Sequence, residues 1–279
     1  MKEILDYIIS RLRESYDADE ARALAWWILE EVSGMSRSQL LIADKGTTNF
    51  ADTQIFEPII DRLLRFEPIQ YIFGHTLWCG LDLKVTPATL IPRPETAELV
   101  DIIVNSQQLK ANSRVLDVGT GSGCIALAIK REHPEWQVTG IDISAEAIEV
   151  ARENAQRNNL DVAFVHQDVF SDEPSAINSQ QYDIIVSNPP YIRECERTTM
   201  RSNVLEYEPE SALFVPDNDP LIFYRRVAAF YKAKFLFFEI NEALGNEMVA
   251  MLKENGYTDI QIHLDSYGKQ RIVTARMDR

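Results

Sequence analysis

A planar amino group could be held by four consecutive residues of the chain, Asn188, Pro189, Pro190 and Tyr191. They follow the apolar run 182–186, which we predict to be a buried strand. Neither proline has an N–H to donate, so the strand must end near Asn188 and continue into a stiff loop. The asparagine side chain and the two proline carbonyls are acceptors, and the tyrosine adds a flat ring. These groups can accept both hydrogens of an –NH2 group, although a proline-terminated turn explains the four residues equally well on their own.

A glycine-rich loop follows the predicted strand 114–118 and has glycine at its first, third and fifth positions. A dinucleotide-binding loop has its third glycine at the sixth position, which is Cys124 here. Asp117 lies two residues before the first glycine, where a carboxylate suits a cationic ligand, such as the ammonium of a methionine moiety, better than a pyrophosphate. We assign to ligand binding the loop residues Gly119, Thr120, Gly121, Ser122 and Gly123.

Two further acidic residues stand at the ends of predicted strands. Asp142 lies 19 positions after Gly123, where an acid can accept both hydroxyls of a ribose. Asp168 follows the next predicted strand and is placed to meet the amino group of an adenine. Val169 and Phe170 come directly after it and would supply apolar cover for the base.

Strands and helices alternate along residues 95–279, an order typical of an α/β fold with a parallel sheet. The carboxyl ends of such strands lie at one edge, so the glycine loop, the two acids and Asn188 should come together there. The last two strands are joined by a short turn, so we expect an antiparallel pair at the sheet edge. The predicted strands are 114–118, 137–142, 162–166, 182–186, 234–240, 257–264 and 271–275, with a loop at 207–213.

The first 72 residues carry short apolar stripes at helical spacing, which indicate a small helical bundle. Trp26 and Trp27 are the largest side chains of the second helix. Core packing is the simpler interpretation of this pair, and a face that docks a partner is the alternative. We assign residues 1–72 to an N-terminal helical substrate-docking domain. Its predicted helices are 2–16, 20–32 and 53–65.

A connector at 73–94 links this bundle to a larger domain at 95–279. Glycines at positions 74 and 80, with apolar alternation after them, predict a β-hairpin. Two prolines then flank Arg93, so this loop is stiff and holds its arginine in place. Arg93 is therefore either an exposed loop charge or a residue near the mouth of the main site.

The net charge of the chain limits the kinds of macromolecule that it can bind. The chain has 279 residues with 28 Lys or Arg and 43 Asp or Glu, a net charge of −15. Neutralisation of phosphates supplies most non-specific affinity for nucleic acid, so a chain this acidic is a poor general binder of DNA or RNA. It can still dock on a basic protein surface.

The three cysteines, at positions 79, 124 and 195, form no CxxC pair and no cluster with histidines. We therefore predict no metal site and no disulfide framework, as expected in a reducing compartment. The sequence has no signal-peptide pattern and no apolar run of the roughly 20 residues that span a bilayer. These observations favour a cytoplasmic protein that uses no membrane.

The ordered set of strand ends resembles the class I S-adenosylmethionine-dependent methyltransferases. The acid-x-Gly-x-Gly-x-Gly pattern from Asp117 to Gly123 is similar to their first motif. The Asn-Pro-Pro-Tyr sequence resembles the motif of the subset that methylates exocyclic or amide nitrogens. Within this subset the chain resembles, over nearly its whole length, the peptide chain release factor glutamine N5-methyltransferases. The segments that carry this resemblance also include 70–74, 90–96, 207–209, 212–213 and 267–271.

The resemblance implies a seven-stranded, mostly parallel Rossmann-like sheet with the last strand antiparallel, and S-adenosyl-L-methionine as cofactor. It implies that the substrate is the glutamine of the Gly-Gly-Gln loop of class 1 release factors, a protein partner, and we expect a monomer. Asn188, Pro189 and Tyr191 would be catalytic, with Asn188 also beside the cofactor. Pro190 and Arg93 would join them in substrate binding. One departure is Val169, at a position that is often aromatic in the family.

Two other functions use parts of the same pattern. An adenine or guanine amino-methyltransferase acting on nucleic acid shares the Asn-Pro-Pro-Tyr motif, but it needs a basic recognition region that this chain lacks. A non-catalytic adaptor could bind S-adenosylmethionine as a sensor, but it would have no need of the acceptors at Asn188.

Overall fold

The computed structural model describes residues 2–42, 53–109, 111–172, 177 and 181–277. The chain divides into two compact units, Met1–Gly74 and His75–Arg279. Within the described residues, no helix combines the length and the apolar character needed to cross a membrane.

The first unit consists of helices packed on one apolar core. Asp17 accepts hydrogen bonds from the backbone of Asp19 and Glu20 and so begins the second helix. Trp26 is 6% exposed and belongs to the core, whereas Trp27 is partly exposed and donates to Glu31 at 3.2 Å. The predicted helix 2–16 is too long, because the last turn before Asp17 is not helical. The elements are α1 Lys2–Leu12, α2 Ala18–Ser33, α3 Arg37–Ile42, η1 Thr53–Phe56, α4 Glu57–Leu64 and α5 Ile69–Phe73.

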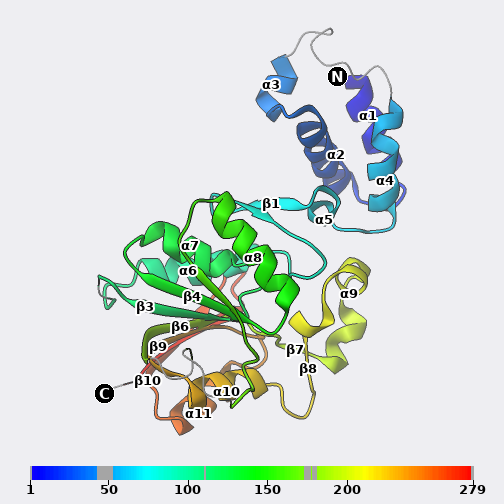
Figure 1. The fold of residues 1–279 in the computed structure, drawn as a ribbon. Coiled ribbons are helices and arrows are strands. Elements are labelled where there is room, and N and C mark those ends of the chain that lie inside the picture. The colour runs from blue at the N-terminus through cyan, green and yellow to red at the C-terminus, as the bar shows by residue number, and fades with distance from the viewer. Residues whose placement is uncertain (1, 43–52, 110, 173–176, 178–180, 278–279) are drawn as a thin grey trace. The chain divides into compact units, whose positions relative to one another are not determined.

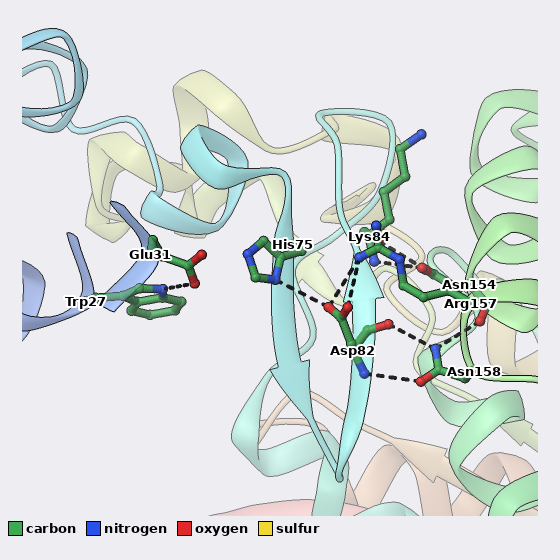
Figure 2. A network of polar contacts seen from close by, with 8 residues as sticks. All are labelled: Trp27, Glu31, His75, Asp82, Lys84, Asn154, Arg157 and Asn158. Atoms are coloured by element: carbon green, nitrogen blue, oxygen red, sulfur yellow. Dashed lines mark hydrogen bonds and ion pairs between the residues drawn. The ribbon is translucent and has the colours of Figure 1, made fainter. Parts of the chain in front are cut away.

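The second unit begins with the expected hairpin, β1 (His75–Trp78) paired antiparallel with β2 (Leu81–Lys84). Figure 2 shows how β2 is held on helix α8 (Ala145–Arg157) by asparagine side chains. Asn154 accepts from the Lys84 N–H at 2.6 Å and donates to the Lys84 carbonyl at 3.0 Å. Asn158 makes the same pair of bonds with Asp82, at 3.2 and 2.9 Å. The hairpin is therefore part of the second unit.

Seven strands form the central sheet, in the order β10-β11-β9-β6-β3-β4-β5. The five strands from β9 to β5 are parallel, and β11 is antiparallel to both of its neighbours. The predicted mostly parallel sheet with an antiparallel last strand is thus confirmed. The strands are β3 Arg114–Val118, β4 Gln137–Asp142, β5 Ala163–His166, β6 Gln181–Ser187, β9 Lys232–Glu239, β10 Thr258–Leu264 and β11 Gln270–Arg276.

Helices cover both faces of this sheet (Figure 1). On one face lie α6 (Pro94–Val104), α7 (Cys124–Glu132) and α8, and on the other lie α10 (Ile222–Phe230) and α11 (Gly245–Glu254). Central strands are consequently apolar on both sides, which explains why they appear in the sequence as continuous apolar runs.

The strand order reverses between β3 and β6. From β3 the chain proceeds to β4 and β5, and it then returns to place β6 on the other side of β3. Ligands of open α/β sheets bind outside the carboxyl ends of the strands at such a reversal. The loops that follow β3 and β6 are the glycine loop and the Asn188 loop.

The segment between β6 and α10 contains short elements that the sequence pattern did not reveal. The loop predicted at 207–213 is partly wrong, since it includes a helix end and a 3₁₀ turn. These elements bury almost no side chains, so they lack the apolar periodicity that marks longer helices. They are β7 Ile192–Arg193, η2 Glu194–Thr199, α9 Ser202–Tyr207, η3 Glu210–Ala212 and β8 Phe214–Val215.

Candidate active site

A pocket of about 380 Å³ lies in the second unit, at the carboxyl edge of the sheet. It brings together residues from all four of the predicted strand ends and from the Arg93 loop. Three of the predicted site residues, Asp117, Gly123 and Tyr191, do not line it. The predicted site residues that line the pocket are Arg93, Gly119, Thr120, Gly121, Ser122, Asp142, Asp168, Val169, Asn188, Pro189 and Pro190.

The glycine loop requires glycine for its backbone conformation. Gly119 and Gly121 have φ of 73° and 53°, in the left-handed region that other residues rarely adopt. The N–H of Gly121 donates to Asp142 Oδ2 at 2.8 Å, so the loop is fixed on the end of β4. At Gly123 a Cβ would lie 2.9 Å from Phe164 Cζ, so this glycine also permits close packing of α7 on the sheet.

Asp117 is completely buried beneath this loop. Its Oδ2 accepts from Thr120 Oγ1 at 2.6 Å and from the Ala126 N–H at 3.3 Å. Burial raises the pKa of the carboxyl to about 7. Its Oδ1 and the Ser122 hydroxyl are buried without a hydrogen-bond partner among the described residues. An unsatisfied acceptor at this place fits a ligand with a cationic, hydrogen-bond-donating group.

Asp142 is held in the pocket wall by two backbone donors. Its Oδ1 accepts from the Ser144 N–H at 2.9 Å, while Oδ2 accepts from Gly121. Each carboxylate oxygen has a second lone pair, so both can accept a ligand hydroxyl as well. Burial raises the pKa of Asp142 above its ordinary value.

The neighbouring wall combines one acid with apolar side chains. Asp168 Oδ1 accepts from the Phe170 N–H at 2.8 Å, which orients the carboxylate. Val169, Phe170 and Phe223 line the same part of the pocket, and the two phenylalanine rings lie 5.2 Å apart. An acceptor beside apolar surface fits a flat base that carries an amino group.

Asn188 lies on a buried chain of hydrogen bonds. Its Nδ2 donates to Thr96 Oγ1 at 3.2 Å, and Thr96 donates to Glu239 Oε2 at 2.7 Å. Tyr191 donates its hydroxyl to the other oxygen, Glu239 Oε1, at 3.0 Å. Thr96 and Glu239 were not predicted as site residues. The available signal was a carboxylate directly after the apolar run 235–238 of β9.

Arg93 is partly buried rather than an exposed loop charge. Its guanidinium forms an ion pair with Glu208 at 2.5 Å, and its carbonyl accepts from Trp78 Nε1 at 2.9 Å. The Glu208 side chain is 1% exposed, and its Oε2 has no hydrogen-bond partner among the described residues. This acid, which the sequence did not indicate as functional, fixes Arg93 in the pocket wall.

The reversed strand order, the glycine loop and the acids at successive strand ends define a methyltransferase of the class I type. Family models agree, since residues 97–207 match the Methyltransferase small domain and residues 3–74 match the PrmC N-terminal domain. A methyltransferase structure from Pyrococcus furiosus covers 80% of this chain and 100% of its own, with 19% identity and a TM-score of 0.52, which supports the fold.

Full-length relatives define the family more closely. A release factor glutamine methyltransferase from Bacteroides thetaiotaomicron is 44% identical and covers 99% of both chains. One from Flavobacterium psychrophilum is 37% identical and covers 95% of both. The chain belongs to the release factor glutamine methyltransferase family. The family and the fold imply the use of S-adenosylmethionine.

Proposed function

We propose that this protein transfers a methyl group from S-adenosyl-L-methionine to the side-chain amide nitrogen, N5, of the glutamine in the Gly-Gly-Gln motif of class 1 release factors. The observation that carries the proposal is the position of Asn188. Its amide and two proline carbonyls stand at the carboxyl end of β6, in the same pocket as the glycine loop of β3. The relatives named for this activity cover nearly the whole chain.

The cofactor supplies an electrophilic methyl group when bound. The Asp117 carboxyl lies beneath the glycine loop and not in the pocket wall, so it would attract the ammonium group by its charge, without direct contact. Asp142, which lines the pocket, would accept from the ribose hydroxyls. Asp168 would accept from the adenine amine, with Val169 and Phe170 as apolar cover. The glycine loop permits the close backbone approach that such binding needs.

The protein's task at the substrate is orientation, because an amide nitrogen is a weak nucleophile. Asn188 Oδ1 and the Pro189 carbonyl would accept its two N–H bonds and direct it into the pocket. Positive charge grows on this nitrogen during transfer, so both acceptors bind the transition state more tightly than the ground state. Orientation of this kind contributes several kcal/mol, about 7–11 in favourable cases. The excess proton can leave to water.

Other residues would support this arrangement. Arg93, held by Glu208, would bind a carbonyl of the substrate, and Pro190 would complete the wall of the pocket. From the sequence we expect Tyr191, with its flat ring, to be catalytic. Its hydroxyl is bound to Glu239 and the residue does not line the pocket, which favours a role in holding the loop. We further propose that the protein acts as a monomer and that residues 1–72 dock the release factor.

Mass spectrometry of a class 1 release factor incubated with the protein and S-adenosylmethionine tests the proposal. We expect a gain of one methyl group on the Gly-Gly-Gln peptide. A release factor with glutamate in place of that glutamine is the control and should stay unmodified. Methylation of nucleic acid instead, or cofactor binding with no methyl transfer, would support the nucleic-acid or adaptor alternative and reject the proposal.

A further inference from the structure

The geometry points to Thr96 and Glu239 as positioning residues that determine which way round the Asn188 side-chain amide lies. The inference rests on the proposed function, because it concerns the acceptor that would hold the substrate amide. Neither residue needs to touch the substrate, since both act through Asn188.

A count of the available protons determines which group donates and which accepts in each hydrogen bond between Asn188, Thr96 and Glu239. An ionised Glu239 carboxylate can only accept, and it receives one bond from Tyr191 and one from Thr96. Burial raises the pKa of Tyr191 far above its ordinary value, so this hydroxyl keeps its proton and donates it. The single proton of Thr96 is used on Glu239, so Thr96 Oγ1 can only accept from Asn188. The group facing Thr96 must therefore be the amide nitrogen, and Oδ1 must point away from it.

The surroundings of Glu239 make its charge adjustable. The side chain is at the end of β9 and is 1% exposed, and burial raises its pKa. The hydrogen bonds from Thr96 and Tyr191 and the positive charge of Arg271 oppose this shift, whereas Glu95 adds to it. Tyr224 does not compete for the carboxylate, because it donates to the backbone carbonyl of Glu239 at 2.8 Å.

Arg271 is itself held at 3.1 Å by Asp265 on the loop before β11, and β11 pairs with β9 beside Glu239. The titratable and charged groups that face Glu239 thus come from α6, the Asn188 loop, α10 and β11. A proton on Glu239 would reverse the direction of these hydrogen bonds. The acid would donate to Thr96, and Thr96 would then donate to Asn188 Oδ1. The amide would turn and present –NH2 to the substrate's –NH2, and one of the two acceptors would be lost.

Substitutions at Thr96 can distinguish a role in orienting the Asn188 amide from a role in packing alone. We expect Thr96→Val to lower kcat about 100-fold, a loss comparable to removal of one transition-state hydrogen bond. Thr96→Ser keeps the hydroxyl and should retain kcat within about threefold. KM for the release factor and affinity for S-adenosylmethionine should change little in both. Thr274→Val is the matched control, since it removes a hydroxyl bonded to His263 at 3.0 Å on the same sheet, outside the pocket.

The side-chain amide protons of Asn188 give a second readout by NMR, without methyl transfer. One of them should exchange slowly with solvent in wild type and Thr96→Ser, and faster in Thr96→Val. Wild-type kcat and unchanged exchange in Thr96→Val would overturn the inference, as would a folded Thr96→Ser protein as slow as Thr96→Val. Failure of the wild-type protein to methylate any release factor would reject the proposed function alone, because the exchange measurement still tests the orientation.

Discussion

Ser187 Oγ donates a hydrogen bond of 2.6 Å to the carbonyl oxygen of Val118, and this buried contact joins the end of β6 to the end of β3. The glycine loop begins immediately after Val118, and the Asn188 loop begins immediately after Ser187. The two loops that the proposed reaction must bring together therefore leave the sheet from bonded neighbours. Sites on rigid elements hold geometry better than sites on free loops.

Asn188→Ala should abolish methyl transfer with little effect on cofactor affinity. The substitution removes the proposed acceptor of the substrate amide, so we expect kcat to fall at least about 100-fold. Turnover and calorimetric binding of S-adenosylmethionine measure the two effects. Asn105→Ala, an exposed position at the end of α6, is the control. Unchanged methyl transfer in Asn188→Ala would remove the basis of the proposed mechanism.

Asp142→Asn should weaken cofactor binding more than catalysis. The new –NH2 group would face the N–H of Gly121 or Ser144, and one ribose acceptor would be lost. We expect an affinity loss of about 10-fold or more, since each lost hydrogen bond to a charged group contributes about 1.5–3 kcal/mol. Calorimetry provides the measurement, with exposed Asp161→Asn for comparison. Equal affinities in the two variants would show that Asp142 does not bind the cofactor.

Arg93→Ala should destabilise the second unit because it leaves the buried Glu208 carboxylate without its ion-pair partner. Arg93 is one-third exposed, so we expect a cost below that of a fully buried pair, about 1–3 kcal/mol. Adding Glu208→Gln should recover part of the loss. Thermal unfolding of both variants tests this coupling, and an equal or larger loss in the double variant would contradict it.

The stability of the cofactor-free protein should depend on the ionisation of Asp117. Its pKa of about 7 in the folded state is above the ordinary 3.8, so between these values the folded state binds more protons than the unfolded state. Raising the pH from about 4 to 7 therefore lowers the free energy of unfolding, by roughly 3 kcal/mol from this group. Asp117→Asn should reduce that decline, measured by denaturation across the range. An identical pH dependence in this variant would contradict the assignment.

Turnover should fall on acidification as Glu239 gains a proton. Its pKa is raised by burial, so the decline should begin at a higher pH than for an exposed glutamate. In Glu239→Gln the side chain cannot ionise, and we expect a lower kcat without this acid decline. The pH dependence of kcat at saturating substrates distinguishes the variants. A decline that persists unchanged in Glu239→Gln must have another origin.

The site residues that could be predicted from the sequence are those that follow a strand with a recognisable local pattern of apolar residues. The strands that precede the glycine loop, Asp142, Asp168 and Asn188 each carry apolar residues in a pattern typical of strands, so their ends could be predicted. Thr96 was not, because its partners Asn188 and Glu239 are 92 and 143 positions away. The bonds of a threonine hydroxyl depend on tertiary packing, which no local pattern records. The short helices before β8 were missed for the related reason that they bury almost nothing.

The side chain of Asn154 forms hydrogen bonds with both strand β2 and the glycine loop. Besides the two contacts with Lys84, its Nδ2 donates to the carbonyl of Ser122 in the glycine loop at 2.9 Å. The backbone of Lys84 and that of Ser122 in the glycine loop, 38 positions apart, therefore share one buried side chain. A ligand that stiffens the loop also restrains the opening of the hairpin, so hydrogen exchange at Lys84 becomes a remote reporter of occupancy in the pocket.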